Sequence, residues 1–379
     1  MLGSARFKIL AFLLVAAFAV TSCKRDRLTP EDSSEFEDLV EREMRKQDIP
    51  AMATLIFRGN DVLYEGYFGK ADVERDVDLG PEHSFLLASI SKTATAAALM
   101  QLYDQGLFSL DDPINDHLPF SVNAPDASTD ITIRMLLTHS SSIADGPALD
   151  GQYYYGTDSP TPLSDFMEAY LVPGGAHYDA SQNFHDFEPG TDHEYSNIGS
   201  ALIGVLVEEI SGMEFNAYCK QALFPVLNMT ASHWRLDEMD TLDIVRPYQK
   251  QGRDLIPLAH YTFTDYPNGG LRATPRDLHQ LAAMYAQGGS LNGATILQAS
   301  TVSDMLNPQI PDLDPTVGLH LFLMDQSNGL WGHDGGESGV STTMAFHPST
   351  QIGVIILTNQ GDAKLDDLQS AAYHLGENL

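Results

Sequence analysis

A serine and a lysine three positions apart, Ser89 and Lys92, open an alanine-rich apolar segment of this chain. The segment continues to Gln105 without an internal proline or glycine, so it predicts a buried helix that ends near Gly106. Residues three apart share one face of a helical turn. A serine hydroxyl is a weak nucleophile until a base activates it, and a desolvated lysine can be that base. The pair predicts a nucleophilic serine; the alternative is a solvated lysine near an ordinary helix start.

Two further motifs carry groups that such a reaction needs. Tyr195 and Asn197 form a Y-x-N motif, and an H-x-G motif starts at His333 and ends in the glycine pair Gly335 and Gly336. A phenol can carry a proton to and from a leaving group when neighbouring cations lower its pKa. An asparagine amide can hold an amine and a substrate amide together. A glycine pair on a strand lets the backbone approach a ligand and present N–H donors to an oxyanion.

Both motifs have a second match in the chain. Tyr266 and Asn268 also fit Y-x-N, but the proline between them and the glycines that follow predict a turn. His374 and Gly376 also fit H-x-G, but they lie on the expected terminal helix, where no strand is available beside a substrate. The matches at Tyr195 and His333 are therefore the candidate site residues.

Composition sets the class of partner. The chain has 379 residues, of which 43% are hydrophobic, enough for one large domain or two lobes with a substantial core. Its 52 acidic and 21 basic residues give a net charge of −31, which repels nucleic acid and anionic lipid head groups. Cys219 is one of only two cysteines, so we expect a packed free thiol and no disulfide framework.

The N-terminal residues have the pattern of an export signal. Positive residues precede a short apolar run in residues 1–22, and that run falls below the ~20 residues of a membrane span. The run ends in a segment that resembles a bacterial lipobox, which would lipidate Cys23. Residues 23–34 would then be a tether on a protein of the bacterial cell envelope. An ordinary signal peptide followed by an incidental cysteine is the alternative.

Hydrophobic periodicity predicts β-structure at both ends of the chain and helices between them. The expected helices cover residues 35–46, 89–105, 131–137, 198–210, 214–223, 274–288 and 365–375. The expected strands cover residues 51–57, 62–68, 318–324, 339–346 and 352–357. Residues 143–188 are expected to be irregular, and they form either a wall of a substrate pocket or a surface excursion over the helices.

With these motifs in this order, the chain resembles the serine β-lactamase and penicillin-binding-protein superfamily. The resemblance is to the class C-like branch, with its family VIII esterases, D-aminopeptidases and D,D-carboxypeptidases. It covers nearly all of residues 34–375, and it includes the segments 107–113, 133–139, 189–191 and 269–271.

The resemblance implies an α/β (α+β) fold, in which helices flank an antiparallel sheet and an all-α lobe is inserted. Residues 35–379 would be this domain. The α/β lobe would comprise about 35–85 and 260–379, and the α lobe about 86–259, with the site between them.

The same resemblance implies a role for each motif. Ser89 would be the acylated nucleophile, Lys92 its base, Tyr195 the proton shuttle and Asn197 an amide that positions the substrate. The backbone N–H groups of Ser89 and Gly336 would form the oxyanion hole. The substrate would be a small ester, an amide or a D-amino-acid peptide, and we expect a monomer without metal or cofactor.

Two departures from the family pattern concern the substrate. His333 stands where most β-lactamases have a lysine, and Ser140–Ser142 replace a more usual Thr-Ser-Gly turn. An imidazole with an ordinary pKa of ~6.5 is often neutral at pH 7. We therefore expect neutral esters to be preferred over β-lactams. We also expect the preference for anionic substrates to fall as pH rises through the His333 titration.

Other readings remain open or fail on pattern. The chain has no G-x-S-x-G motif of an α/β-hydrolase, and the segment after His193 breaks the H-E-x-x-H pattern of a zinc protease. The spacing of the acidic and histidine residues in 177–193 matches no common metal site. A D,D-carboxypeptidase or a weak β-lactamase remains an alternative enzyme. The non-enzyme alternative is an envelope sensor that keeps the fold without turnover.

Overall fold

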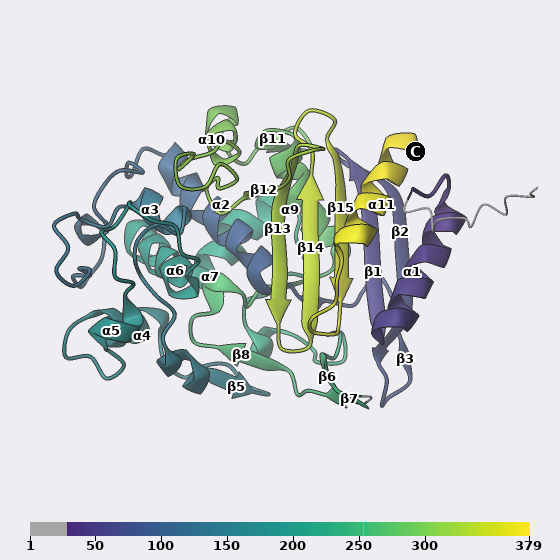
Figure 1. Cartoon of the computed structure of the whole chain (residues 1–379), viewed down its shortest axis with the longest axis horizontal. Helices are drawn as coiled ribbons and strands as arrows, with labels where there is room; N and C mark the ends of the chain where they lie inside the picture. The colour runs from purple at the N-terminus through teal and green to yellow at the C-terminus, as the bar shows by residue number, and fades with distance from the viewer. Residues whose placement is uncertain (1–28, 253) are drawn as a thin grey trace, which may run out of the picture.

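The computed structural model describes residues 29–252 and 254–379, and it is built on a seven-stranded antiparallel sheet (Figure 1). The strand order is β12-β13-β14-β15-β1-β2-β3, so strands from the two ends of the chain meet where β1 pairs with β15. The strands are β1 Ala51–Arg58, β2 Asp61–Asp72, β3 Val77–Asp78, β12 Phe322–Asp325, β13 Leu330–Glu337, β14 Val340–Phe346 and β15 Ile352–Thr358. The predicted fold class is confirmed.

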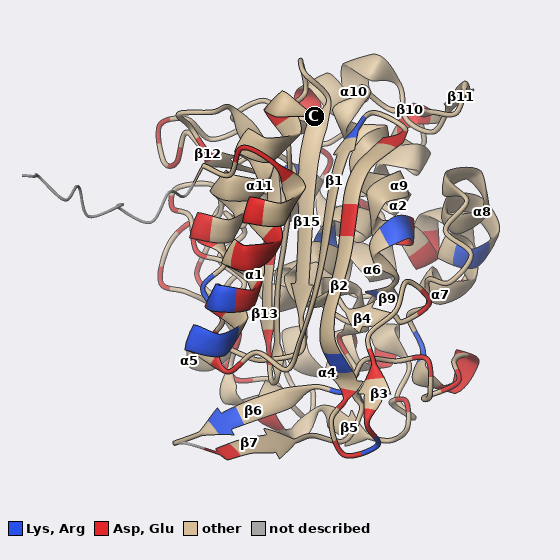
Figure 2. Ribbon diagram, turned by 90° about the vertical axis from the view of Figure 1, so that its right-hand side faces the viewer, with Lys and Arg blue, Asp and Glu red and all other residues tan. Residues whose placement is uncertain are grey.

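Both faces of this sheet are covered by helices. The helices α1 (Ser33–Gln47) and α11 (Asp366–Asn378) lie on the outer face, and α9 lies on the inner one, with α2 beyond it (Figure 2). Strand β1 is therefore apolar along nearly its whole length. Leu55 belongs to the inner core and Ile56 to the outer core, as the alternation of side chains along a strand requires.

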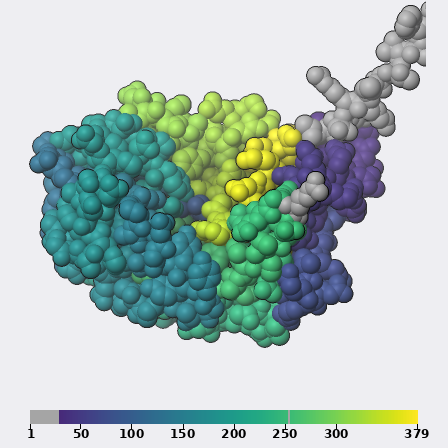
Figure 3. All heavy atoms as spheres, turned by 60° about the horizontal axis from the view of Figure 1, so that its bottom comes forward, coloured from purple at the N-terminus to yellow at the C-terminus, as the bar shows by residue number. Residues whose placement is uncertain are grey.

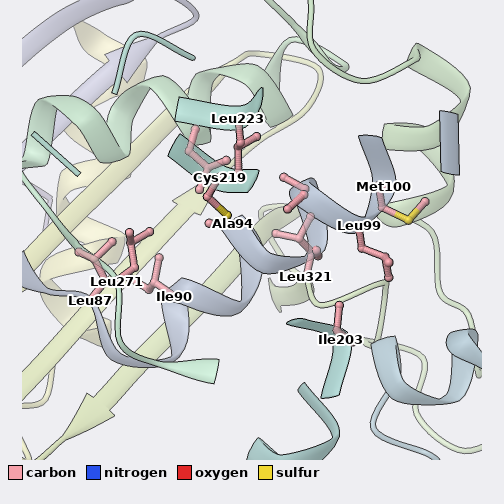
Figure 4. Close-up of a cluster of buried hydrophobic side chains, with 14 of the residues drawn as sticks. Leu87, Ile90, Ala94, Leu99, Met100, Ile203, Cys219, Leu223, Leu271 and Leu321 are labelled. Atoms are coloured by element: carbon pink, nitrogen blue, oxygen red, sulfur yellow. The ribbon is translucent and has the colours of Figure 1, made fainter. Parts of the chain in front are cut away.

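The helical part of the molecule packs against the inner face beside β13 (Figure 1). Its central helix is α2 (Ser91–Asp104), which lies against α6 (Asn197–Ser211). The helix is buried along most of its length, and its Ala94 and Leu99 lie in one apolar cluster with Cys219, Leu223 and other side chains (Figure 4). Cys219 is a buried free thiol, as predicted, and burial raises its pKa.

The other helices and short strands complete this framework. The helices are α3 Ile133–Leu137, α4 Leu163–Leu171, α5 Ala180–Asn183, α7 Phe215–Tyr218, α8 Phe224–Leu227, α9 Pro275–Ala286 and α10 Ala299–Met305. The two-stranded pairs are β4 Phe85–Leu86 with β9 Arg272–Ala273, β5 Tyr153–Tyr155 with β8 Tyr261–Phe263, β6 Tyr248–Gln251 with β7 Asp254–Pro257, and β10 Ser290–Leu291 with β11 Ala294–Thr295. No helix within the described ranges has the length and apolar character needed to span a bilayer.

Three expectations about local structure need correction. The serine motif opens in a 3₁₀ turn, Ala88–Ile90, before α2 begins. Residues 143–188 are not wholly irregular, because α4 buries Phe166 and Tyr170 on one face. The helix expected at 214–223 changes to a π-helical turn at Cys219–Leu223 and continues into α8. The predicted signal peptide and Cys23 lie outside the described residues.

The close approach of the 3₁₀ turn to β13 depends on a glycine. A Cβ added at Gly335 would lie 2.4 Å from the Leu87 carbonyl oxygen and 2.1 Å from Thr342 Oγ1. Thr342 donates to that same carbonyl at 2.8 Å, which fixes the turn against the sheet. A Cβ at the neighbouring Gly336 would meet nothing within 4 Å. Gly335 is therefore needed for packing, and Gly336 borders open space.

This contrast predicts different stabilities for two single substitutions. Gly335→Ala should lower the free energy of unfolding by about 1–3 kcal/mol or more, because the new methyl group overlaps backbone and side-chain atoms. Gly336→Ala should stay within ~0.5 kcal/mol of the unmutated protein. Thermal unfolding followed by circular dichroism measures both. Equal melting temperatures for the two variants would contradict the packing role of Gly335.

Candidate active site

The amine of Lys92 is the centre of the candidate site. Its Nζ lies 3.1 Å from Ser89 Oγ, 2.8 Å from Asn197 Oδ1 and 2.8 Å from the backbone carbonyl oxygen of Asn268. The side chain is fully buried. Three acceptors from three separate segments thus satisfy the three donors of a charged ammonium group. When the amine is neutral, the Ser89 hydroxyl can donate to its lone pair instead.

Burial also adjusts the proton affinity of Lys92. Desolvation lowers its pKa to about 7, and the charges of Asp145, Asp265 and Glu337 oppose that fall. A lysine in water has a pKa of ~10.4 and is almost wholly protonated at neutral pH. At pH 7, a large fraction of Lys92 is therefore the free base that a serine nucleophile requires.

At neutral pH the Tyr195 phenol keeps its proton, whereas the Lys92 amine loses its proton readily. The Tyr195 hydroxyl hydrogen-bonds to Ser89, and Lys92 Nζ lies 4.9 Å from the centre of the phenol ring. Tyr195 is 39% exposed toward the cavity side of the site, yet desolvation by the surrounding residues raises its pKa, and the Asp145 charge adds to the rise. The expectation that nearby cations lower this pKa is wrong. The pair therefore combines an amine that can accept a proton with a phenol that can give one.

An unpredicted carboxylate, Asp145, fixes the Asn197 amide. It accepts hydrogen bonds from Asn197 Nδ2 at 2.8 Å, from the Asn197 backbone N–H at 2.9 Å and from the Ile198 N–H at 3.0 Å. These donors lie at the start of α6, where the helix dipole also favours an anion. The amide oxygen of Asn197 is thereby turned toward Lys92. Asp145 and its partners lie far apart in sequence, so no local pattern reveals the contact.

A cavity of about 230 Å³ lies beside Ser89. It brings together Ser89, Tyr195, Asn197 and Gly336, while Lys92 and Gly335 are absent from its lining. Its other lining residues are Ala88, Leu149, Tyr153, Phe263, Asp265, Asn268, Gly269 and Glu337. In Figure 3 the surface is hollowed where the teal helical part meets the yellow-green residues of the sheet. Residues of the segment 143–188 line the cavity, which favours the pocket-wall interpretation of that segment.

His333 is placed differently from the sequence expectation. It is only 5% exposed and does not line the cavity; its Nδ1 donates to the Asp334 carbonyl oxygen at 2.6 Å. Its ring lies edge-on to Tyr195 and Phe322. Burial, reinforced by the nearby Lys92 charge, lowers its pKa to about 3. The expected titration of His333 near neutral pH is therefore wrong, because the imidazole stays neutral throughout the physiological range.

A second histidine, His139, supports the catalytic tyrosine candidate from behind. Its ring stacks on Tyr195 with centroids 4.2 Å apart, and its Nδ1 accepts the Ser196 N–H at 3.2 Å. His139 and Ser142 both have positive φ, at 54° and 62°, so the serine-rich turn folds back tightly here. Sequence reasoning assigned no role to His139.

The two residues of the second Y-x-N match, Tyr266 and Asn268, have different positions relative to the site. Tyr266 packs with Phe215 and Trp234 away from Ser89, whereas Asn268 enters the site through its backbone carbonyl. Among residues 29–252 and 254–379, no group of three or more histidine, cysteine or acidic side chains is arranged to hold a metal ion.

Residues 36–376 match the beta-lactamase family profile, which covers most of the chain. The chain belongs to the beta-lactamase family. Members of this family are typically serine hydrolases, and the site has the residues for that chemistry. Protein flp of Staphylococcus aureus (strain MRSA252) is 21% identical over 88% of the chain, and the match spans 64% of its own length. Beta-lactamase-like protein 2 of Dictyostelium discoideum is 24% identical over 85% of the chain and 58% of its own length.

Solved structures share the fold. An octameric penicillin-binding protein homologue from Pyrococcus abyssi superposes with a TM-score of 0.72 at 24% identity, covering 91% of this chain and 77% of its own. EstCE1, described as a hydrolase with promiscuous acyltransferase activity, superposes with a TM-score of 0.71 at 18% identity, covering 91% and 97%. At these identities the likeness concerns the fold alone.

The electrostatics of Lys92 predict how Ser89 reactivity depends on pH. Labelling by a fluorophosphonate probe should accelerate as pH rises through about 7, where the amine loses its proton. Asp145→Asn removes a charge that holds this pKa up, so the rise should move to lower pH by roughly 1 unit. The matched control is Asp38→Asn on the exposed face of α1, which should leave the profile unchanged. A shift to higher pH in Asp145→Asn would contradict the assignment.

Proposed function

We propose that this protein is a serine acyl-hydrolase that works through a covalent acyl-enzyme on Ser89. The observation that carries the proposal is the buried Lys92 amine, 3.1 Å from the Ser89 hydroxyl and with a pKa of about 7. A lysine on a solvated surface has no reason to show either property. The adjoining cavity gives a small acyl group access to the hydroxyl.

The groups around Ser89 suit both halves of such a reaction. Neutral Lys92 takes the hydroxyl proton as Ser89 Oγ bonds to the scissile carbonyl carbon. The backbone N–H groups of Ser89 and Gly336 donate to the oxygen that becomes negative. Tyr195 gives its proton to the leaving group and recovers one from Lys92, while Asn197 holds the substrate amide. In the second half, the oxygen of a water molecule bonds to the acyl carbon, and the water proton is relayed through Tyr195 and Lys92 to Ser89 Oγ. The bond between Ser89 Oγ and the acyl carbon then breaks, and the acid is released.

We assign the substrate to small esters or amides, with a D,D-carboxypeptidase or weak β-lactamase activity as the second candidate. The cavity lining contains no lysine, arginine or histidine, so nothing there pairs with the carboxylate of a β-lactam or of a C-terminal peptide. Asp265 and Glu337 line it instead. This charge distribution favours neutral substrates over anionic ones without any contribution from His333.

The mechanism predicts how the catalytic candidates depend on one another. Ser89→Ala and Lys92→Ala should each nearly abolish hydrolysis, and Tyr195→Phe should lower kcat by ~10²-fold or more. Because these residues act as a unit, the Ser89→Ala/Lys92→Ala double variant should be scarcely worse than either single one. The assay uses p-nitrophenyl esters, D-amino-acid amides, a D-Ala-D-Ala peptide and nitrocefin. Additive losses, or normal activity in Ser89→Ala, would refute the mechanism.

The non-enzyme alternative gives a different result in the same assay. An envelope sensor would react once with a fluorophosphonate or a β-lactam at Ser89 and would then show no turnover. Labelling that disappears in Ser89→Ala, together with repeated turnover of any substrate, supports the enzyme. Labelling without turnover supports the sensor.

We also propose that the mature protein is a lipoprotein of the bacterial cell envelope, a monomer anchored through Cys23. The lipobox-like sequence supports this proposal. Mass spectrometry of the mature N-terminus should show a diacylglyceryl group on Cys23, and Cys23→Ser should release the protein from membranes. A mature protein that begins at any other residue would contradict the anchor.

A further inference from the structure

The cavity beside Ser89 is negatively charged. Two carboxylates, Asp265 and Glu337, belong to its lining, and no basic side chain does. They come from two separate segments: Asp265 precedes the turn that supplies the Asn268 carbonyl, and Glu337 ends β13 beside Gly336. Both carboxylates raise the pKa of Lys92, so both lie within electrostatic range of the reacting centre.

Neither carboxylate has a cationic hydrogen-bond partner. Asp265 is only 7% exposed and accepts the Asn268 amide at 2.7 Å. Glu337 accepts the Tyr153 hydroxyl at 3.0 Å and the Ser338 N–H at 2.7 Å. These partners are neutral, and within the described part of the chain no ion pair to either carboxylate is formed. Glu337 and the ionised fraction of Asp265 therefore give the cavity lining negative charge that no basic lining residue balances.

The Asp265 carboxyl is held close to its titration point at neutral pH. Burial raises its pKa to about 7, and repulsion from Asp145 adds to the rise. A cation bound in the cavity would stabilise the ionised form, because opposite charges attract strongly in a partly desolvated space.

The negative charge also continues outside the cavity. A groove of about 580 Å³ shares Gly336 and Glu337 with it and reaches the start of α11. The acidic residues of this groove are Asp334, Glu337, Asp362 and Asp366, and its one basic residue is Lys364. A cationic ligand is thus favoured in this adjoining groove as well as in the cavity.

We propose that the substrate carries a protonated amine close to its scissile carbonyl and that Asp265 and Glu337 bind this amine. The substrate class is then an aminoacyl ester or amide, rather than a simple alkyl ester or a carboxylate-bearing lactam. This inference rests on the proposed serine hydrolase function and makes its substrate specific.

Three acyl groups of nearly the same shape test the charge preference. They are alanyl (both enantiomers), 2-methylpropanoyl and the mono-acyl group of methylmalonic acid, which place an ammonium, a methyl or a carboxylate on the same carbon. Each is offered to the full-length protein in detergent at pH 7 as its p-nitroanilide and its ethyl ester. An α-amino group has a pKa of ~7.7–8.0, so the alanyl compounds are mainly cationic. For one enantiomer, kcat/KM should exceed that of the neutral compound by ~10-fold or more, and the anionic compound should be slowest.

Substitutions separate recognition from the intrinsic reactivity of the compounds. Asp265→Asn and Glu337→Gln keep the shape and remove the charge, so each should lower the cationic-to-neutral ratio of kcat/KM by ~5-fold or more. The control is Asp38→Asn on α1, an exposed acid on the opposite face of the sheet, which should leave the ratio unchanged.

The outcomes distinguish the two levels of the proposal. A ratio near 1 with Ser89-dependent turnover, or a high ratio that neither variant lowers, overturns the amine inference and leaves the hydrolase function intact. Absence of Ser89-dependent turnover for every compound, including the neutral ones, overturns both.

Discussion

The desolvation of one amine governs the rest of this structure. A fully buried ammonium is tolerated only when each of its donors has an acceptor, and Lys92 finds them on Ser89, Asn197 and the Asn268 carbonyl. Meeting that requirement brings α2, α6 and the turn before β9 to one point. The same burial lowers the pKa to about 7, which makes the amine a usable base. Packing and reactivity therefore have one physical origin.

The surrounding carboxylates limit how far this effect goes. Burial alone would lower the pKa of Lys92 further, and Asp145, Asp265 and Glu337 partly restore it. Asp145 also orients the Asn197 amide, so one carboxylate serves both geometry and electrostatics. Two of the three carboxylates face the cavity, where they repel anionic ligands and attract cationic ones. The carboxylates that raise the pKa of Lys92 thus also influence which substrates can approach it.

Sequence patterns predicted those features of the site that lie within one segment of the chain. The Ser89–Lys92 spacing, the apolar run of α2 and the alternation in β1 follow from periodicity, and the order of the motifs indicated the fold. Asp145, the Asn268 carbonyl and the stacking of His139 depend on segments far apart in the chain, which no spacing encodes. The error at His333 has the same cause, because its pKa depends on burial that only the packed structure defines.

The burial of His333 explains why an imidazole fits this position. The His333 ring packs edge-on against Tyr195. It is close enough to Lys92 for the lysine charge to lower the pKa of His333. A lysine at this buried position would place a second ammonium group close to Lys92. It would have to lose its proton, displace Tyr195 or move toward the cavity, and each route changes the geometry at Ser89. A neutral ring instead fills the space beside Phe322 with a single hydrogen bond to the Asp334 carbonyl. The histidine therefore packs edge-on against the tyrosine and supports it. The charge that selects a substrate comes from the carboxylates of the cavity wall.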